Sequence, residues 1–258
     1  MFVHNIDPVL FDVGPFEIRY YGIAYVLAFL AVFFFLKWYV RKYTIENFKE
    51  DDVADFLILL LVSMIVGARF FHVFVYNFGY YMSNPSEIIM IWNGGLAFHG
   101  GLVGILIAAY FYLKKKKINF YDLADVIVIP LAFGLALGRI ANFINGELVG
   151  IKTNIGWCVK FPGYEGCKHP VVLYESVKNI FIGIVLIFVH FKGKFAKGTV
   201  FWSFIALYGF LRFMAQFLRA NEIMIGPFDL PQYFSLLMLL VGGVMLYMVK
   251  SKSYLNTL

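Results

Sequence analysis

The sequence predicts an all-α, polytopic membrane protein with about seven transmembrane helices. Of 258 residues, 61% are hydrophobic and only 15% are charged, and the mean hydropathy is +0.77. A soluble domain has a much more polar composition. Apolar runs long enough to cross ~30 Å of hydrocarbon as a helix, roughly 20 residues each, recur along the whole chain. The protein is therefore expected to cross the membrane several times rather than through a single anchor.

Each predicted span is an apolar run bounded by polar or turn-forming residues. In chain order the seven runs cover residues 20–39, 53–75, 96–113, 123–143, 171–191, 199–217 and 232–249. The fourth differs from the others because Asp122 and Asp125 stand at its start and Pro130 interrupts it. Neighbouring helices can supply a donor for the carbonyl that a proline leaves free. The fourth run is accordingly also predicted to span.

The lysines give the predicted orientation. They occupy alternate connections and the C-terminal tail: Lys37, Lys42 and Lys49; Lys114–Lys117; Lys192, Lys194 and Lys197; and Lys250 and Lys252. The positive-inside rule makes these connections cytoplasmic, so the N-terminus is predicted to lie outside and the C-terminus inside. The whole chain, 1–258, is predicted to be a single integral membrane domain. Within it, 1–19 is an amphipathic segment along the outer leaflet rather than a cleaved signal peptide, and 145–170 is a small extracytoplasmic loop.

Several function classes are excluded or left open by composition. The net charge of +6 follows from the lysines of the topology signal, so no nucleic-acid partner is expected. Cys158 and Cys167 lie in the predicted extracytoplasmic loop, where a disulfide and two free thiols are both admissible. Two thiols with His169 nearby do not make a metal site. No nucleotide loop, zinc pattern or serine-nucleophile elbow occurs, and no cofactor is expected.

The arginines are distributed differently from the lysines. Five of the six map to the predicted outer ends of spans: Arg19, Arg69, Arg139, Arg212 and Arg219. Arginine presents a planar fork of donors that suits phosphate, so the bias favours an anionic ligand shared by these residues. The alternative is that each arginine snorkels or pairs with Glu17, Glu147, Glu175, Glu222 or Asp229. Arg139 with Asn142, and Arg212 with Gln216 and Arg219, have spacings that place them on one helix face.

His99 is the candidate proton-transfer residue, because glycines flank it at the predicted outer end of the third span and imidazole titrates near neutrality. A hydrogen-bonded structural role is the alternative, and it is the interpretation kept for His72 and His190. Tyr20 and Tyr21 fit an interfacial aromatic belt. The pairs Gly100/Gly104 and Gly134/Gly138 have the spacing that lets helices approach closely.

The segment 138–150, G-R-I-A-N-F-I-N-G-E-L-V-G, resembles the signature G-R-x-[GA]-N-F-x-N-x-E-x-x-G of the bacterial phosphatidylglycerol–prolipoprotein diacylglyceryl transferases. Further segments resemble the family in the same order along nearly the whole chain: Gly14-Pro15, Arg19-Tyr20-Tyr21-Gly22, Tyr76-Asn77-Phe78, Phe98-His99-Gly100-Gly101-Leu102, His169-Pro170, Leu173-Tyr174-Glu175 and Tyr208-Gly209 with Arg212 and Arg219. The chain departs from the family pattern at Gln216, where relatives often have Glu, at His72, where Tyr is frequent, and at Val171-Val172.

This resemblance implies a reaction and its participants. The diacylglyceryl group of phosphatidylglycerol passes to the lipobox cysteine thiol in a prolipoprotein signal peptide, without a cofactor, at the extracytoplasmic face of the bacterial cytoplasmic (inner) membrane. A thioether forms and glycerol 1-phosphate is released. By resemblance His99 is the base or proton relay, Arg139 binds the lipid phosphate and Arg212 steadies the leaving group.

The resemblance also assigns supporting residues, which orient the head group and shape the site: Tyr21, Gly100, Asn142, Asn145, Glu147, Gly150 and Arg219. The rival hypothesis is a transporter or flippase for an anionic lipid or solute, in which arginines line a path. Charge that collects at one end of the spans speaks against such a path. A noncatalytic scaffold is the third possibility, and it leaves the 138–150 segment unexplained.

Overall fold

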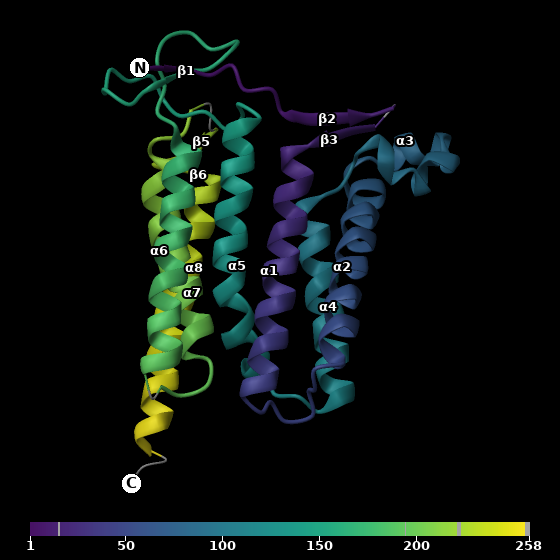
Figure 1. The fold of residues 1–258 in the computed structure, drawn as a ribbon, viewed down its shortest axis with the longest axis vertical. Coiled ribbons are helices and arrows are strands. Elements are labelled where there is room, and N and C mark those ends of the chain that lie inside the picture. The colour runs from purple at the N-terminus through teal and green to yellow at the C-terminus, as the bar shows by residue number, and fades with distance from the viewer. Residues whose placement is uncertain (15, 194, 221–222, 256–258) are drawn as a thin grey trace. The chain divides into compact units, whose positions relative to one another are not determined.

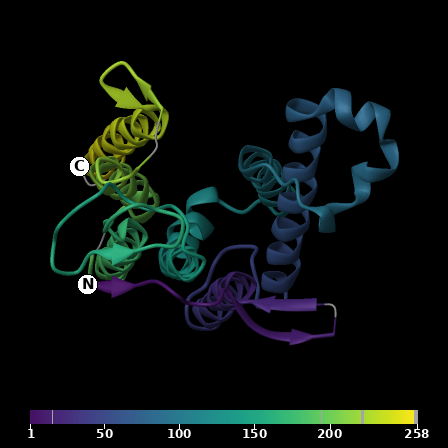
Figure 2. The same cartoon turned by 90° about the horizontal axis from the view of Figure 1, so that it is seen from above.

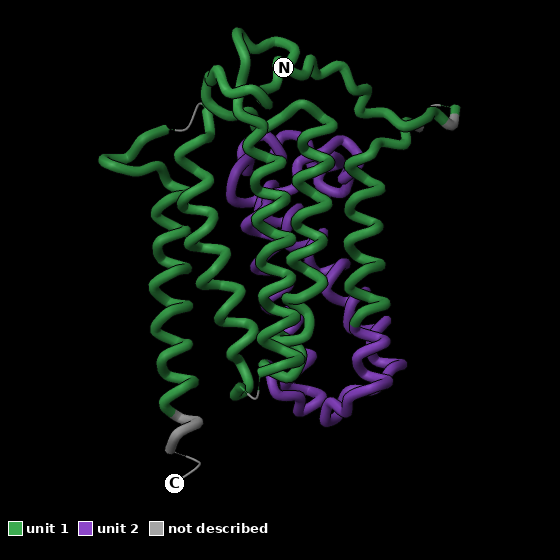
Figure 3. Tube along the Cα trace, turned by 60° about the vertical axis from the view of Figure 1, so that its left-hand side comes forward, with its two compact units in different colours: residues 1–35, 121–258 green, residues 36–120 purple. Residues whose placement is uncertain are grey.

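The computed structural model describes residues 1–14, 16–193, 195–220 and 223–255. They form two compact units (Figure 3), Met1–Phe35 with Tyr121–Leu258, and Leu36–Phe120. The boundary between the units falls inside the first helix, α1 (Tyr20–Lys42). Each unit is described by itself below.

The first unit is built from long helices joined by short strands. Besides the N-terminal part of α1 it contains β1 (Phe2–Val3), β2 (Val9–Val13), β3 (Phe16–Arg19), α5 (Phe120–Ile144), β4 (Val159–Lys160), α6 (Val171–Lys192), α7 (Thr199–Gln216), β5 (Met224–Ile225), β6 (Phe228–Asp229) and α8 (Leu230–Leu255). Helix α7 packs along both α6 and α8, as Figures 1 and 2 show. The buried core joins α5, α6 and α7 through Ile129, Ile182 and Phe204 with their neighbours.

The second unit contains two long helices and a string of short turns. Its elements are α2 (Asp52–Phe71), a π-helical turn (His72–Tyr76), α3 (Phe78–Ser83), two 3₁₀ turns (Pro85–Ile89 and Ile91–Asn93) and α4 (Phe98–Lys116). Helices α2 and α4 lie side by side (Figure 1). They cross at glycines: a Cβ added to Gly67 would lie 2.4 Å from the carbonyl oxygen of Gly100. The predicted close approach at Gly100 and Gly104 is confirmed for this helix pair.

Among the residues that the structure describes, five helices are long and apolar enough to cross a membrane: α1, α2 with its π-helical turn, α5, α6 and α8. The polytopic membrane class is therefore confirmed. Helix α5 continues through Pro130 without a break, as predicted for the fourth span. Helices α4 and α7 also form where spans were predicted, but they are the shortest of the helices at predicted spans, with 19 and 18 residues. Polar side chains such as His99 and Arg212 lower the hydropathy of these two helices, so the total of seven spans stays a prediction. The orientation of the chain in the membrane also stays a prediction.

The structure adds strands to a chain predicted to be all-α. Strand β1 pairs in parallel with β4, β2 pairs with β3, and β5 pairs with β6. Each strand has two to five residues, and all of them lie in 1–19 or in connections between helices. Backbone groups outside helices need partners, and short ladders provide them. Residues 1–19 thus contain three strands, and their position along the outer leaflet stays a prediction.

The start of α7 is capped from another helix. The carboxylate of Asp125 on α5, which is buried, accepts hydrogen bonds from the backbone N–H of Gly198 at 2.6 Å and of Phe201 at 2.7 Å. Helix α7 has no side-chain cap of its own at Gly198. The first N–H groups of a helix have no partner within the helix, so Asp125 supplies the acceptors that they lack.

Replacement of Asp125 by alanine is expected to lower the free energy of unfolding by ~1–3 kcal/mol, because buried donors lose their acceptor. Thermal unfolding in one detergent measures the change. Asp122→Ala is the matched control. Asp122 lies on the same helix and pairs at 2.6 Å with Lys197, whose side chain is 67% exposed, and such pairs contribute at most ~1 kcal/mol. Equal losses in the two variants would contradict the capping role.

Candidate anion site

A fully buried carboxylate lies at the centre of the candidate site. Glu175, on α6, has no exposed surface. Its Oε2 lies 2.7 Å from Nε of Arg139 on α5, and its Oε1 lies 3.2 Å from Nε of Arg219. Arg212 on α7 also pairs with Oε1 through Nη1. Three guanidinium groups therefore surround one carboxylate, and a cationic excess of about two charges is available for a negative ligand.

A chain of amides connects this cluster with the end of α5. Arg139 donates from Nη1 to Oδ1 of Asn142 at 3.1 Å, and Asn142 donates from Nδ2 to Oε1 of Glu147 at 2.8 Å. Asn145 donates to the same oxygen at 3.3 Å. Gly146 has φ +68°, a left-handed conformation that glycine adopts without strain. The turn brings Glu147 back against Asn142, so segment 138–150 folds into one hydrogen-bonded unit.

Gly150 contacts two other parts of the chain, at His169 and Arg219. Its N–H donates to the carbonyl of His169 at 3.1 Å, and it forms a bridge with Arg219. On either side Ile151 donates to Leu218 at 2.9 Å and Ala220 donates to Val149 at 3.2 Å. These backbone bonds hold Arg219 at the cluster, so Gly150 has a clear positioning role.

Gly150→Ala is expected to lower the free energy of unfolding by ~1–3 kcal/mol, the usual effect of overpacking. An added Cβ would lie 2.5 Å from the carbonyl oxygen of His169 and 2.5 Å from Cγ2 of Val171. Gly138→Ala is the control, since a Cβ there meets nothing within 4 Å and alanine favours a helix interior by ~1 kcal/mol. Thermal unfolding should therefore move in opposite directions in the two variants. A loss of stability in Gly138→Ala of the same size would contradict the packing argument.

Tyr21 belongs to the same unit as the cluster. Its hydroxyl hydrogen-bonds with that of Tyr25 at 3.0 Å, and Glu147 and Arg139 are close enough to act on it electrostatically. The side chain is half-buried. Tyr21 is thus near the amide chain and retains a surface on which a ligand can lie.

His99 lies in the second unit, in the first turn of α4. Its side chain is exposed, and Nδ1 hydrogen-bonds with the hydroxyl of Tyr76 at 3.1 Å. The Tyr76 partner orients the ring and leaves Nε2 without a hydrogen bond among the described residues. Gly100, the next residue, is buried at the crossing with α2, so its contacts are those of helix packing.

Three of the five arginines predicted at outer ends of spans converge on Glu175 within the first unit. Arg19 pairs with Glu17, at 2.5 Å from Nη2 and 2.9 Å from Nε. Arg69 is buried and donates to five backbone carbonyls, those of Glu87, Ile88, Met90, Gly94 and Gly95. Pairing, the alternative for single arginines, is confirmed at Glu17 and Glu175. Of the other predicted acids, Asp229 bonds Gln216, and Glu222 lies outside the described residues, as does Pro15.

Two buried polar residues next to Glu175 were not predicted as site residues from the sequence. Lys178 is 8% exposed, with Nζ 4.0 Å from the ring centre of Tyr208, and Asn179 is 1% exposed. Within the part of the chain that the structure describes, neither side chain has a hydrogen-bond partner. Their spacing of three and four residues from Glu175 in an apolar helix was the available signal, since it places all three on one face. Lys178 thus places a buried amine beside Glu175.

The two cysteines form a disulfide, Cys158–Cys167. This settles the alternative that the sequence left open. The bridge lies beside β4 in the 145–170 loop, where Val159 and Lys168 exchange backbone hydrogen bonds at 3.0 and 2.9 Å. The disulfide and the backbone hydrogen bonds between Val159 and Lys168 together fix the loop that carries Gly150.

Comparison with known proteins places this chain in a family. The family model for prolipoprotein diacylglyceryl transferase matches residues 8–248. Three similar proteins, all named phosphatidylglycerol–prolipoprotein diacylglyceryl transferase, come from Geobacter sulfurreducens, Rickettsia canadensis and Vibrio atlanticus. The first is 38% identical over 96% of this chain and 97% of its own length, the second 36% over 94% and 96%, and the third 34% over 94% and 90%. The chain belongs to the prolipoprotein diacylglyceryl transferase family.

Proposed function

We propose that this protein transfers the sn-1,2-diacylglyceryl group from phosphatidylglycerol to the lipobox cysteine thiol of prolipoproteins, the first step of bacterial lipoprotein maturation. The names of the similar proteins supply the two substrates. The observation that carries the proposal is the cluster of Arg139, Arg212 and Arg219 around the single carboxylate of Glu175. Such a cluster has the charge and the donors to bind a lipid phosphodiester.

The reaction is an alkylation at carbon. The thiolate sulfur attacks the carbon of the diacylglyceryl group that is bonded to the phosphate. A C–S bond forms at this carbon, and its C–O bond to the phosphate breaks. The thiol proton goes to a base, and the electron pair leaves with phosphate as glycerol 1-phosphate. Negative charge on the phosphate grows from one to two during this step, so guanidinium groups stabilise the transition state more than the bound lipid.

The residues of the first unit divide into two roles. Arg139 binds the phosphate, with Arg212 and Arg219 beside it to stabilise the departing dianion. Asn142, Asn145 and Glu147 hold Arg139 through their hydrogen-bond chain, and Tyr21 borders the head group. Gly150 sets the position of Arg219. Gly100 supports the helix that carries His99.

His99 is proposed to accept the thiol proton, with Tyr76 to orient its ring. His99→Gln is expected to lower the rate of transfer by ~10²-fold or more and to alter its pH profile, because glutamine cannot accept the thiol proton. Tyr76→Phe keeps His99 but removes the hydrogen bond at 3.1 Å, so a loss of about 3- to 10-fold is expected. An unchanged pH profile in His99→Gln would remove this histidine as the proton carrier.

The site is proposed to face the extracytoplasmic side of the bacterial inner membrane, with the N-terminus outside. Lysine placement supports this orientation. In the same arrangement 1–258 functions as one membrane domain, and 1–19 lies along the outer leaflet, where exposed Leu10 and Phe11 contact lipid.

One assay tests the function. Purified protein in detergent is incubated with phosphatidylglycerol and a lipobox peptide, and mass spectrometry follows the diacylglyceryl-modified cysteine while an enzymatic assay follows free glycerol phosphate. We expect equal amounts of both products. A peptide whose cysteine is replaced by serine is the control. A transporter or flippase for anionic lipid, the alternative, would give neither product, and the names of the similar proteins do not favour it.

A further inference from the structure

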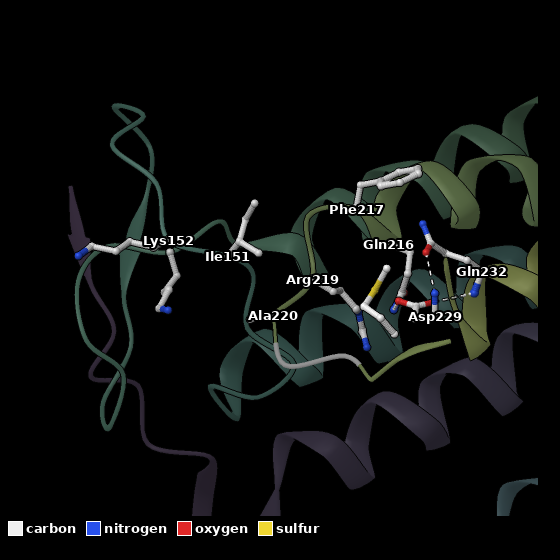
Figure 4. Close-up of a pocket in the computed structure, with 10 residues that line it drawn as sticks. Ile151, Lys152, Gln216, Phe217, Arg219, Ala220, Asp229 and Gln232 are labelled. Carbon is white, nitrogen blue, oxygen red and sulfur yellow. Dashed lines mark hydrogen bonds between the residues drawn. The ribbon is translucent and has the colours of Figure 1, made fainter. Parts of the chain in front are cut away.

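A second cationic feature adjoins the arginine cluster in the first unit. A pocket of about 450 Å³ is lined by Ile151, Lys152, Lys168, Gln216, Phe217, Arg219, Ala220, Met224, Asp229 and Gln232. Its volume falls within the ~300–1,000 Å³ typical of ligand sites. In Figure 4, Lys152 projects from the loop on one side, Asp229 and Gln232 lie together on the other, and Arg219 lies between them. Arg219 also contacts Glu175 at 3.2 Å, so the pocket and the cluster share one residue.

The two lysines are held opposite each other. Lys152 and Lys168 are partners in an antiparallel bridge, flanked by hydrogen bonds from Thr153 to Cys167 at 2.9 Å and from His169 to Ile151 at 3.1 Å. This is the type of pair without mutual hydrogen bonds, in which side chains approach more closely. Like charges placed directly opposite destabilise a ladder, so the arrangement has an energetic cost that an anion between the two ammonium groups would offset.

No carboxylate neutralises this lysine pair among the described residues. Within those ranges neither lysine forms an ion pair. The stem of Lys152 passes over Gly166, where an added Cβ would lie 2.9 Å from Cε, so the side chain has a defined course. The disulfide partner Cys167 precedes Lys168 directly. The backbone of Lys152 and Lys168 is therefore fixed in place, and both ammonium groups can bind an anion.

Asp229, the acidic residue of the pocket, already has hydrogen-bond donors for both of its oxygens. Asp229 accepts from Nε2 of Gln216 at 2.8 Å through one oxygen and from the backbone N–H of Gln232 at 2.8 Å through the other. All three side chains are buried. The lining thus contains three cationic residues and one carboxylate whose oxygens both have donors. Its net charge of about +2 matches a phosphate monoester dianion better than the monoanionic diester of an intact lipid.

We infer that this pocket binds the glycerol phosphate leaving group after the C–O bond breaks, and passes it from the buried arginine cluster to water. The inference rests on the proposed function for the identity of the ligand. Arg219 is the shared contact, and Lys168, half-buried, and Lys152, exposed, continue the positive charge outward. The other product keeps its acyl chains in the bilayer, so a polar exit separates the two products by their chemistry.

Product inhibition tests the inference. The compared quantity is the ratio of Ki for glycerol 1-phosphate to KM for phosphatidylglycerol, at constant ionic strength. We expect the ratio to rise about 10-fold in Lys152→Gln/Lys168→Gln, because charge-assisted hydrogen bonds to the dianion are lost. Lys160→Gln is the matched control: this lysine lies in the same loop but lines another cavity, with Val3, His4, Phe161, Pro162, Tyr164 and Gly166. An unchanged ratio in the double variant, or an equal rise in Lys160→Gln, would overturn the assignment.

A binding measurement separates this inference from the proposed function. Calorimetric titration of glycerol 1-phosphate into the full chain in uncharged detergent needs neither lipid donor nor peptide. Wild-type protein is expected to bind, and the double variant about 10-fold more weakly. The ligand should also raise the unfolding temperature of the wild type more than that of the variant. Absence of transfer with binding intact would refute only the proposed function, whereas transfer with equal binding by both proteins would refute only the pocket.

Discussion

Glu175→Gln is expected to lower the free energy of unfolding by ~3–5 kcal/mol, the usual effect of removing one partner from a buried ion pair. The substitution preserves the shape of the side chain and removes its charge. Three guanidinium groups that now share the buried carboxylate of Glu175 would repel one another. Thermal or urea unfolding in a single detergent measures the change. The rate of transfer should fall together with stability, because the arginines no longer converge.

Two comparisons make this prediction specific. Glu17→Gln removes the carboxylate that pairs with Arg19, but both side chains are about half exposed, at 51% and 56%, so a change of at most ~1 kcal/mol is expected. Added inorganic phosphate should raise the unfolding temperature of Glu175→Gln more than that of the wild type, since an anion can take the place of the missing charge. Equal stabilisation of both proteins by phosphate would show that the cluster is not the anion site.

Arg139→Ala is expected to lower kcat/KM for phosphatidylglycerol by ~10²- to 10³-fold, as loss of one donor to a developing oxyanion does in other enzymes. Among the arginines of the cluster, its side chain is the most exposed, at 22% against 13% for Arg212 and 9% for Arg219. Arg139 therefore has the largest surface available to a ligand. Steady-state rates at several lipid concentrations measure the effect.

The lysine variant at the same position separates charge from geometry. Arg139→Lys retains the positive charge but loses the planar fork, and it cannot hold Glu175 and Asn142 together as Arg139 does through Nε and Nη1. Partial recovery is expected, with about 10-fold less activity than the wild type. Full turnover of Arg139→Ala at low lipid concentration would contradict the phosphate-binding role, and full recovery by lysine would show that charge alone suffices.

Helices were predictable because each depends on local composition. The predicted run 123–143 lies inside α5, and 171–191 differs from α6 by one residue. The ends were less predictable. Helix α4 continues to Lys116 and α8 to Leu255, since a helix does not stop where its side chains become polar. Strands β1 and β4 were not predicted because their partners, such as Phe2 and Val159, lie far apart in sequence. The pairs β2–β3 and β5–β6 are local hairpins, but strands of two to five residues are too short to give a clear alternating pattern.

The site was predictable only in part for the same reason. Spacing on one helix correctly joined Arg139 with Asn142. Nothing local indicates that Glu175 is the common partner of three arginines, because that contact brings together separate parts of the chain. Arg69 was predicted as a possible ligand-binding residue, but its role in the fold could not be predicted. Its neighbours in sequence are apolar, and only the folded loop reveals that carbonyls between Glu87 and Gly95 use all of its donors.

The compact folding of segment 138–150 has a consequence for how the family signature identifies function. Asn142 and Asn145 both donate to Glu147, Gly146 permits the turn, and Gly150 fits where a methyl group does not. Most of the signature therefore records what the turn needs in order to fold. A relative that had lost catalysis but kept this architecture would retain those letters. Under the roles proposed for Arg212 and His99, which lie outside the signature, these two are the positions at which an inactive descendant would be recognised.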